Sequence, residues 1–125
     1  MGRNILCIED NKDNMTLLKR VLESSGFSIQ QAFNGWDGLK IAETEPVDLI
    51  ILDINLPDID GYEVTRRLRA SNFSNVAHLP IIIVTANVQQ RDVDEAMAAG
   101  ATAFITKPVD VFELCDQIQA YLCQK

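Results

Sequence analysis

The side chains best suited to chemistry in this sequence stand at the ends of its apolar segments. Glu9 and Asp10 follow the first such segment, Asp53 ends the third, Thr85 ends the fourth and Lys107 follows the fifth. If these segments are parallel strands, their carboxyl ends meet at one edge of a sheet and bring the five side chains together. Two carboxylates about 4 Å apart repel each other by about 4 kcal/mol at an effective dielectric constant near 20. A multivalent cation would relieve that repulsion.

The residue types favour Mg2+ as the cation. The acidic group offers oxygen ligands with no His or Cys among them, which selects a hard ion, and a site open to water favours Mg2+ over a dedicated Ca2+ cage. A nucleophilic Asp, a divalent metal, a Lys and a hydroxyl are the parts that phosphoryl transfer needs. The backbone N–H of Ala86, beside Thr85, would add a hydrogen bond to a phosphoryl oxygen. The sequence therefore predicts phosphoryl transfer at this edge.

Five strands alternating with five helices are expected to position these groups. The third and fourth strands (DLIILD and PIIIVTA) are almost wholly apolar, as strands buried on both faces of a parallel sheet are, whereas SIQQAF is more polar and predicts an edge strand. Right-handed crossovers then give a doubly wound α/β fold of the (βα)5 type. Gly26 and Gly100 stand where helices should end. The predicted strands run from Asn4 to Glu9, Ser28 to Phe33, Leu49 to Asp53, Ile81 to Ala86 and Ala103 to Thr106.

Length and composition restrict the possible partners. With 125 residues, of which 47% are hydrophobic and 23% charged, the chain predicts one globular domain. A net charge of -7 argues against direct binding to nucleic acid or anionic lipid. The sequence contains no apolar run of 18 residues, so no membrane-spanning helix is predicted. The three Cys include no CxxC pair, so neither a disulfide framework nor a zinc site is predicted, and a cytoplasmic location is expected.

Four motifs closely resemble those of the receiver domains of two-component response regulators. They are IEDN at 8–11, DLIILDINLPDIDG at 48–61, VTA at 84–86 and FITKP at 104–108. Each motif is weak alone, but their order, spacing and positions at strand ends agree along the whole chain. The resemblance implies one receiver domain over residues 1–125, with a flavodoxin-like five-stranded sheet of order 2-1-3-4-5.

The resemblance also implies a phosphoacceptor and its metal ligands. Asp53 would accept the phosphoryl group. Mg2+ would be bound by Asp10, Asp53 and the backbone carbonyl of Asn55, with Glu9 acting largely through water. These assignments name the acidic residues that the spacing already brings together, and they add Asn55.

Further residues match the parts of the family that respond to phosphorylation. Thr85 corresponds to the switch hydroxyl, Lys107 to the lysine that contacts the phosphoryl group, and Phe104 to a rotating aromatic residue that is often Tyr. The resemblance also implies a cis peptide bond between Lys107 and Pro108.

The expected partners are proteins. The resemblance implies that a sensor histidine kinase or a histidine phosphotransfer protein donates the phosphoryl group. A downstream protein would read a surface made by the fourth helix, the fifth strand and the fifth helix. The chain is then a signalling phosphoacceptor and not a turnover enzyme. It is a stand-alone regulator, a phosphorelay intermediate or a receiver cut from a hybrid kinase, and the sequence leaves these open.

Other functions match the sequence less well. A haloacid-dehalogenase-type phosphatase carries a DxDx(T/V) motif near its first strand, whereas this chain has DIN at a central strand. A calcium loop with Gly61 at its sixth position would start at Leu56 and end at Arg67, which are not ligands. A flavin protein needs a hydroxyl- or Gly-rich loop after the first strand, where this chain has acids. The remaining alternative is a degenerate receiver that binds proteins without phosphorylation.

Overall fold

Five parallel strands form one sheet at the centre of the molecule. The computed structural model describes residues 3–86, 89–107 and 109–122. The strands lie in the order β2-β1-β3-β4-β5, with every neighbouring pair parallel, as the sequence predicts. The elements are β1 (Asn4–Ile8), α1 (Lys12–Ser24), β2 (Ser28–Ala32), α2 (Gly35–Thr44), β3 (Leu49–Asp53), α3 (Gly61–Arg69), α4 (Ser74–Ala77), β4 (Ile81–Thr85), α5 (Gln90–Ala99), β5 (Ala103–Thr106) and α6 (Val111–Leu122).

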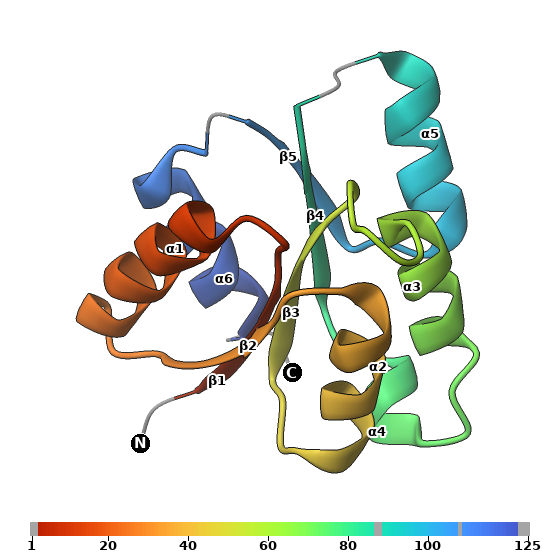
Figure 1. The fold of residues 1–125 in the computed structure, drawn as a ribbon, viewed down its shortest axis with the longest axis horizontal. Helices are drawn as coiled ribbons and strands as arrows, with labels where there is room; N and C mark the ends of the chain where they lie inside the picture. Colours follow the sequence, from red (N-terminus) through yellow and green to blue (C-terminus); the bar gives the residue numbers. More distant parts are fainter. Residues whose placement is uncertain (1–2, 87–88, 108, 123–125) are drawn as a thin grey trace.

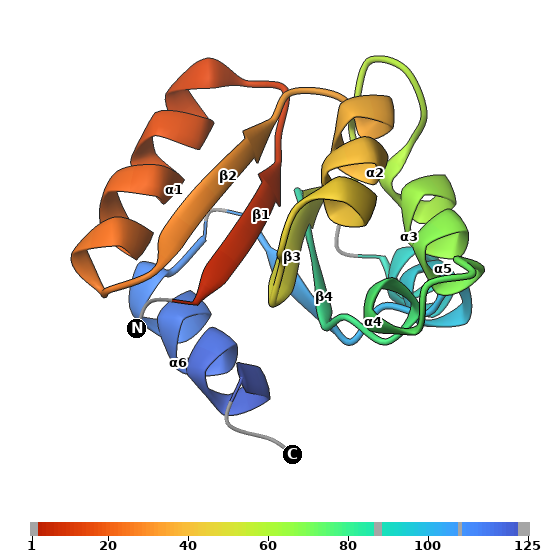
Figure 2. The ribbon, with the colours of Figure 1, turned by 90° about the horizontal axis from the view of Figure 1, so that it is seen from below.

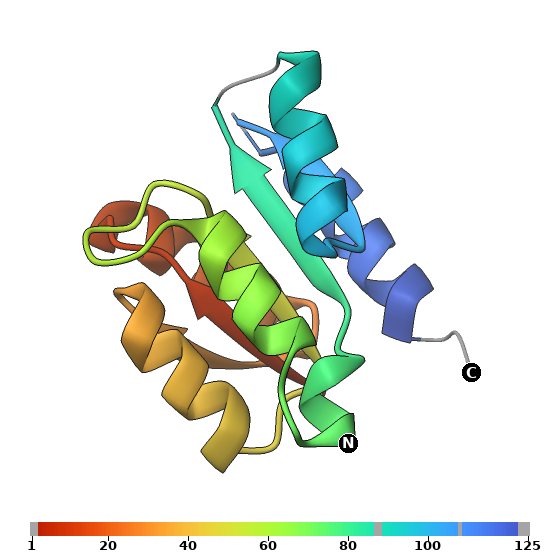
Figure 3. The same cartoon turned by 90° about the vertical axis from the view of Figure 1, so that its right-hand side faces the viewer.

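Helices cover both faces of the sheet, so the fold has three layers. Helices α1 and α6 lie on one face, and α2, α3 and α5 lie on the other (Figure 1). Figure 2 shows the sheet between these two layers, and Figure 3 shows α2, α3 and α5 side by side over their face. This is the doubly wound, flavodoxin-like arrangement, in which ligands bind at the carboxyl ends of the strands.

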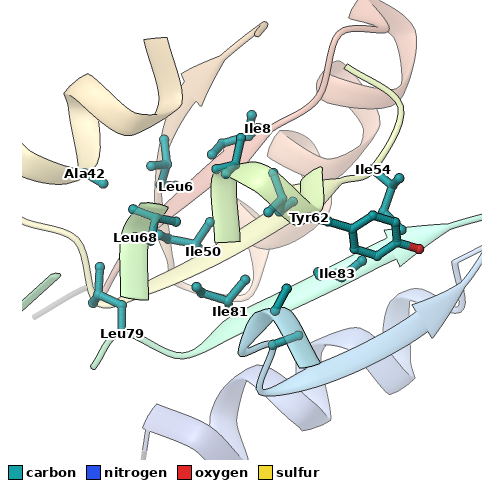
Figure 4. Close-up of a cluster of buried hydrophobic side chains, with 14 of the residues drawn as sticks. Leu6, Ile8, Ala42, Ile50, Ile54, Tyr62, Leu68, Leu79, Ile81 and Ile83 are labelled. Carbon is teal, nitrogen blue, oxygen red and sulfur yellow. The ribbon is translucent and has the colours of Figure 1, made fainter. Parts of the chain in front are cut away.

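The alternation of side chains along the strands divides the core in two. In β3, Ile50 and Leu52 join the cluster under α2, α3 and α5, part of which Figure 4 shows. Leu49 and Ile51 join the cluster under α1 and α6. All five residues of β3 and all five of β4 are buried, whereas β2 lies at an edge and is mostly part-exposed. The prediction of buried central strands and a polar edge strand is confirmed.

The boundaries and the number of helices differ from the prediction in detail. Strands β1, β2 and β4 each end one residue earlier than predicted. Among the described residues there are six helices rather than five, because one turn of helix, α4, lies in the connection before β4. A four-residue turn is too short to show a helical period in the sequence. Its one buried residue, Val76, packs into the core cluster under α3.

Two glycines end helices as predicted. Gly26 follows the last turn of α1 with φ of 97°, and Gly100 caps α5 with φ of 108°. These are left-handed conformations, which glycine adopts without steric cost. Over the described residues, no helix is both long and apolar enough to cross a membrane.

Candidate functional site

Three carboxylates meet at the carboxyl edge of the sheet. Asp53 is the last residue of β3, and Glu9 and Asp10 follow β1, the neighbouring strand. One carboxylate oxygen from each of the three lies within 4.8 Å of the others. Glu9 and Asp53 are each only 4% exposed, while Asp10 is exposed. The structure therefore brings together the acidic residues that the sequence singled out.

Lys107 places its ammonium group against two of these carboxylates. Its Nζ lies 2.7 Å from Asp53 Oδ2 and 3.5 Å from Glu9 Oε2. Its backbone N–H donates to the carbonyl oxygen of Thr85 at 2.8 Å, which ties the segment after β5 to the end of β4. The side chain of Lys107 is thereby directed back over the end of β3.

Backbone N–H groups orient two of the carboxylates. The N–H of Asn11 donates to Glu9 Oε1 at 3.1 Å, and that of Asn55 donates to Asp53 Oδ1 at 3.0 Å. Each bond joins residues two apart in the loop that follows its strand. The loops after β1 and β3 thus hold the carboxylate of Glu9, which follows β1, and that of Asp53, which ends β3.

Burial, hydrogen bonds and neighbouring charges change the pKa values of Glu9 and Lys107. Burial and a hydrogen bond with Asp53 raise the pKa of Glu9 from 4.5 to about 7, although the N–H of Asn11 and the charge of Lys107 act in the opposite direction. Burial lowers the pKa of Lys107, but its hydrogen bond with Asp53 and the acidic charges outweigh that effect and raise it overall. One ammonium group thus contacts two of the three carboxyl groups in the cluster. Sequence reasoning did not anticipate that Glu9 would hold a proton so strongly.

The donor set matches a hard divalent cation. All the side-chain ligands that converge are carboxylate oxygens, and Asp10 keeps one side open to water, which suits an ion that retains part of its water shell. Asn55, the fourth predicted ligand, is exposed and lies in the loop directly after Asp53. Its N–H already binds the Asp53 carboxylate, so its backbone adjoins the acidic cluster.

The predicted switch residues lie on one face of the sheet. Thr85 ends β4 and is 1% exposed, and Ala86, directly after it, is exposed. Phe104 pairs with Ile83, two residues before Thr85, and packs partly buried against the core cluster under α2, α3 and α5. Because residues two apart in a strand share a face, Thr85 and Phe104 are on the α5 side. Pro108, for which a cis peptide is predicted, lies outside the described residues.

A pocket opens from the site toward α1. Its volume is about 220 Å3, and its lining includes Leu17 and Leu18 of α1, Val109 after β5, and Asp53 and Lys107. Leu17 is 60% exposed, although it is a large apolar residue. Sequence reasoning missed this pocket, because Leu17 lies next to the buried stripe of α1 and nothing in the sequence marks it as exposed.

Comparison with known proteins gives consistent matches over nearly the whole chain. The family model of the response regulator receiver domain matches residues 5–119. The polar-differentiation response regulator DivK of Brucella anthropi is 34% identical over 122 residues, which cover 98% of each chain.

Solved structures of receiver domains are also similar to this chain. The receiver domain of sensor histidine kinase PA1611 from Pseudomonas aeruginosa, solved with a magnesium ion coordinated in its active-site cleft, is 34% identical. It has a TM-score of 0.91 over 99% of this chain and 100% of that chain. A CheY-like response regulator receiver domain from Methanospirillum hungatei is 28% identical, with a TM-score of 0.89 over 98% of this chain and 94% of that chain.

Proposed function

Because this chain belongs to the family of response regulator receiver domains, we propose that it is a signalling phosphoacceptor whose residues 1–125 form one receiver domain. In this proposal Asp53 takes a phosphoryl group from a sensor histidine kinase or a histidine phosphotransfer protein. One observation carries the proposal: the buried carboxylate of Asp53 lies 2.7 Å from Lys107 Nζ and beside the oxygens of Glu9 and Asp10. A nucleophile, a cation and a site for a second cation are the requirements of phosphoryl transfer.

The transfer moves one phosphoryl group between two side chains. A carboxylate oxygen of Asp53 attacks the phosphorus of a phosphohistidine. The phosphorus–nitrogen bond breaks, and its electron pair stays on the imidazole nitrogen. The products are an aspartyl phosphate and a free His on the donor, so the chain is itself the acceptor and not a turnover enzyme.

The side chains of the site have separate tasks in this step. Glu9, Asp10, Asp53 and the carbonyl of Asn55 would hold Mg2+, Glu9 largely through water. When bound, Mg2+ neutralises charge on the phosphoryl oxygens. Lys107, now paired with Asp53, would pair with a phosphoryl oxygen after transfer.

The donor protein reaches Asp53 along α1. The pocket is lined by Asp53 together with the apolar side chains of Leu17, Leu18 and Val109. An apolar side chain next to the donor His would fill this pocket and exclude water while the phosphoryl group is transferred. The exposed Leu17 then belongs to the surface that binds the donor.

Phosphorylation would change the surface formed by α5, β5 and α6, which binds the downstream protein. The Thr85 hydroxyl and the N–H of Ala86 bind the phosphoryl oxygens, and Thr85 moves inward to do so. The space it leaves is on the face where Phe104 packs, so Phe104 moves in and the surface of α5, β5 and α6 changes. These are the fourth helix, fifth strand and fifth helix of the sequence-based prediction. A downstream protein binds that surface in the cytoplasm. The chain itself contacts neither nucleic acid nor a membrane in this proposal.

Mass spectrometry tests the proposal. The intact protein should gain one phosphoryl group when treated with a small acyl phosphate and Mg2+, and should gain none with EDTA. Asp53→Asn should abolish the gain, because an amide is not a nucleophile. The control Asp60→Asn changes a nearby exposed aspartate that caps α3, and it should still be labelled. Equal labelling of Asp53→Asn and wild type would refute the assignment of Asp53.

A further inference from the structure

The loop between Asp53 and α3 has backbone hydrogen bonds near its start and at its junction with α3. It spans residues 54–60 and is mostly exposed or partly exposed. At its start, the N–H of Asn55 binds Asp53, and at its end the N–H of Gly61 donates to the carbonyl of Ile54 at 2.9 Å. A Cβ on Gly61 would lie 2.8 Å from the Asp53 carbonyl oxygen, so α3 begins directly against the end of β3. The N–H of Leu56 also donates to the carbonyl of Ile54, at 3.1 Å. Further support comes from outside the loop.

Asp58 connects the middle of the loop to that support. Its Oδ1 accepts from the N–H of Gly35 and its Oδ2 from the N–H of Trp36, both at 2.8 Å. These are the first two N–H groups of α2, more than twenty residues away in the sequence. The hydrogen bonds outweigh the effect of burial and lower the pKa of Asp58, which therefore binds as a carboxylate.

Among the hydrogen bonds of the described residues, these two N–H groups of α2 have no other acceptor. The side chain of Asn34 accepts from the N–H of Asp37, and the Asn34 carbonyl accepts from that of Gly38. The first N–H groups of a helix have no intrahelical acceptor, so Asp58 completes the cap. The first two residues of α2 are therefore bonded directly to the loop after Asp53.

Close packing of side chains against Gly35 reinforces this link. A Cβ on Gly35 would lie 2.5 Å from Ile59 Cγ1 and 2.9 Å from Val64 Cγ2. Only glycine lets the first residue of α2 lie directly on the residue that follows Asp58. The loop is thus held on α2 by two hydrogen bonds and by the close contact at Gly35.

We propose that Asp58 is a positioning residue of the phosphoacceptor site, which holds the loop after Asp53 on α2 and so keeps the Asn55 carbonyl in place for Mg2+. The inference rests on the proposed function, because it requires Mg2+ to bind at Asp53 and Asn55. Asp58 is not one of the carboxylates that converge in the acidic cluster. Residues that orient metal ligands typically change metal affinity by about tenfold or more when they are replaced.

Calorimetric titration of the purified protein with Mg2+ tests the role of Asp58. Asp58→Ala should raise the Mg2+ dissociation constant by about tenfold. Asp58→Asn removes the same charge but keeps one acceptor oxygen, and it should fall between Asp58→Ala and wild type. The control Asn34→Ala removes the neighbouring cap of the same helix without releasing the loop, so it should lower the melting temperature and change the dissociation constant by less than about twofold.

Labelling kinetics provide the second measurement. With an acyl phosphate as donor, Asp58→Ala should be slower than wild type at low Mg2+ and should approach the wild-type rate at saturating Mg2+. A role in helix capping alone would change the melting temperature but not this Mg2+ dependence.

The outcomes separate this inference from the proposed function. If wild type binds no Mg2+, the proposed metal site fails and the inference fails with it. If wild type binds Mg2+ and Asp58→Ala binds it equally well, only the role of Asp58 is refuted. Equal weakening by Asp58→Ala and Asn34→Ala, or by Asp58→Ala and Asp58→Asn, would also refute it, because helix stability or charge alone would then explain the effect.

Discussion

Replacing Glu9 by Gln should stabilise the metal-free protein at neutral and alkaline pH. The folded state raises the pKa of Glu9 from 4.5 to about 7, so it favours the protonated carboxyl. The stability from this group is complete below pH 4.5 and is lost as the pH rises through 7. Gln resembles the protonated form, because its carbonyl can accept from Asn11 and its amide can donate to Asp53.

The size of the effect follows from the two pKa values. The difference between 4.5 and about 7 corresponds to about 3 kcal/mol of unfolding free energy above pH 7, at about 1.4 kcal/mol for each pKa unit. Glu9→Gln escapes that loss, so at pH 8 it should be more stable than wild type by up to about 3 kcal/mol. At pH 5 the two proteins should differ by less than about 1 kcal/mol, because wild-type Glu9 is then mostly protonated when folded.

Urea unfolding in EDTA, followed by circular dichroism at pH 5 and pH 8, measures this difference. The control Glu23→Gln removes an exposed negative charge from α1 and should change stability by less than about 0.5 kcal/mol at either pH. A Glu9→Gln variant that is no more stable than wild type at pH 8, or that gains equally at both pH values, would refute the reasoning.

Three further predictions concern metal, switch and loop. Millimolar Mg2+ should raise the melting temperature of wild type more at pH 8 than at pH 5, because at low pH the proton on Glu9 competes with the cation. Thermal melts with Mg2+ or EDTA measure this difference. A larger increase in melting temperature at pH 5 than at pH 8 would contradict the prediction. Thr85→Ala should leave phosphorylation largely intact but uncouple it from the surface of α5, β5 and α6. In wild type, beryllofluoride with Mg2+ should shift amide NMR signals over residues 89–112, and these shifts should be lost in Thr85→Ala; a variant that keeps them would refute the switch. Gly61→Ala should lower the free energy of unfolding, measured in urea, by about 1 to 3 kcal/mol. The added Cβ would lie 2.8 Å from Ile54 Cα and from the Asp53 carbonyl oxygen. Unchanged stability would contradict this prediction, because the loop would then have moved to accommodate the Cβ.

The sheet was predictable because its signals are local. Apolar strands of four or five residues, separated by helical segments, determine the βα repeat, and right-handed crossovers restrict the topology. The convergence of Glu9, Asp10 and Asp53 then follows from parallel strands, since each residue ends or follows a strand. Lys107 meets Asp53 for the same reason.

The features that were missed depend on contacts between distant segments. The raised pKa of Glu9 arises from its burial beside Asp53, which no spacing reveals. Asp58 reads as an ordinary loop aspartate, and only the fold shows that it caps a helix more than twenty residues away. The one-turn helix α4 is too short for its periodicity to be recognised.

The location of the phosphoryl group tests the central claim most directly. Borohydride reduces an aspartyl phosphate to homoserine, so peptide mass spectrometry after phosphorylation and reduction identifies the residue that was modified. The wild-type protein, treated with a phosphohistidine donor protein and Mg2+, should carry homoserine at Asp53 and at no other aspartate. Homoserine at Asp10, or a protein that remains unmodified with an active donor, would contradict the assignment of Asp53 as the phosphoacceptor.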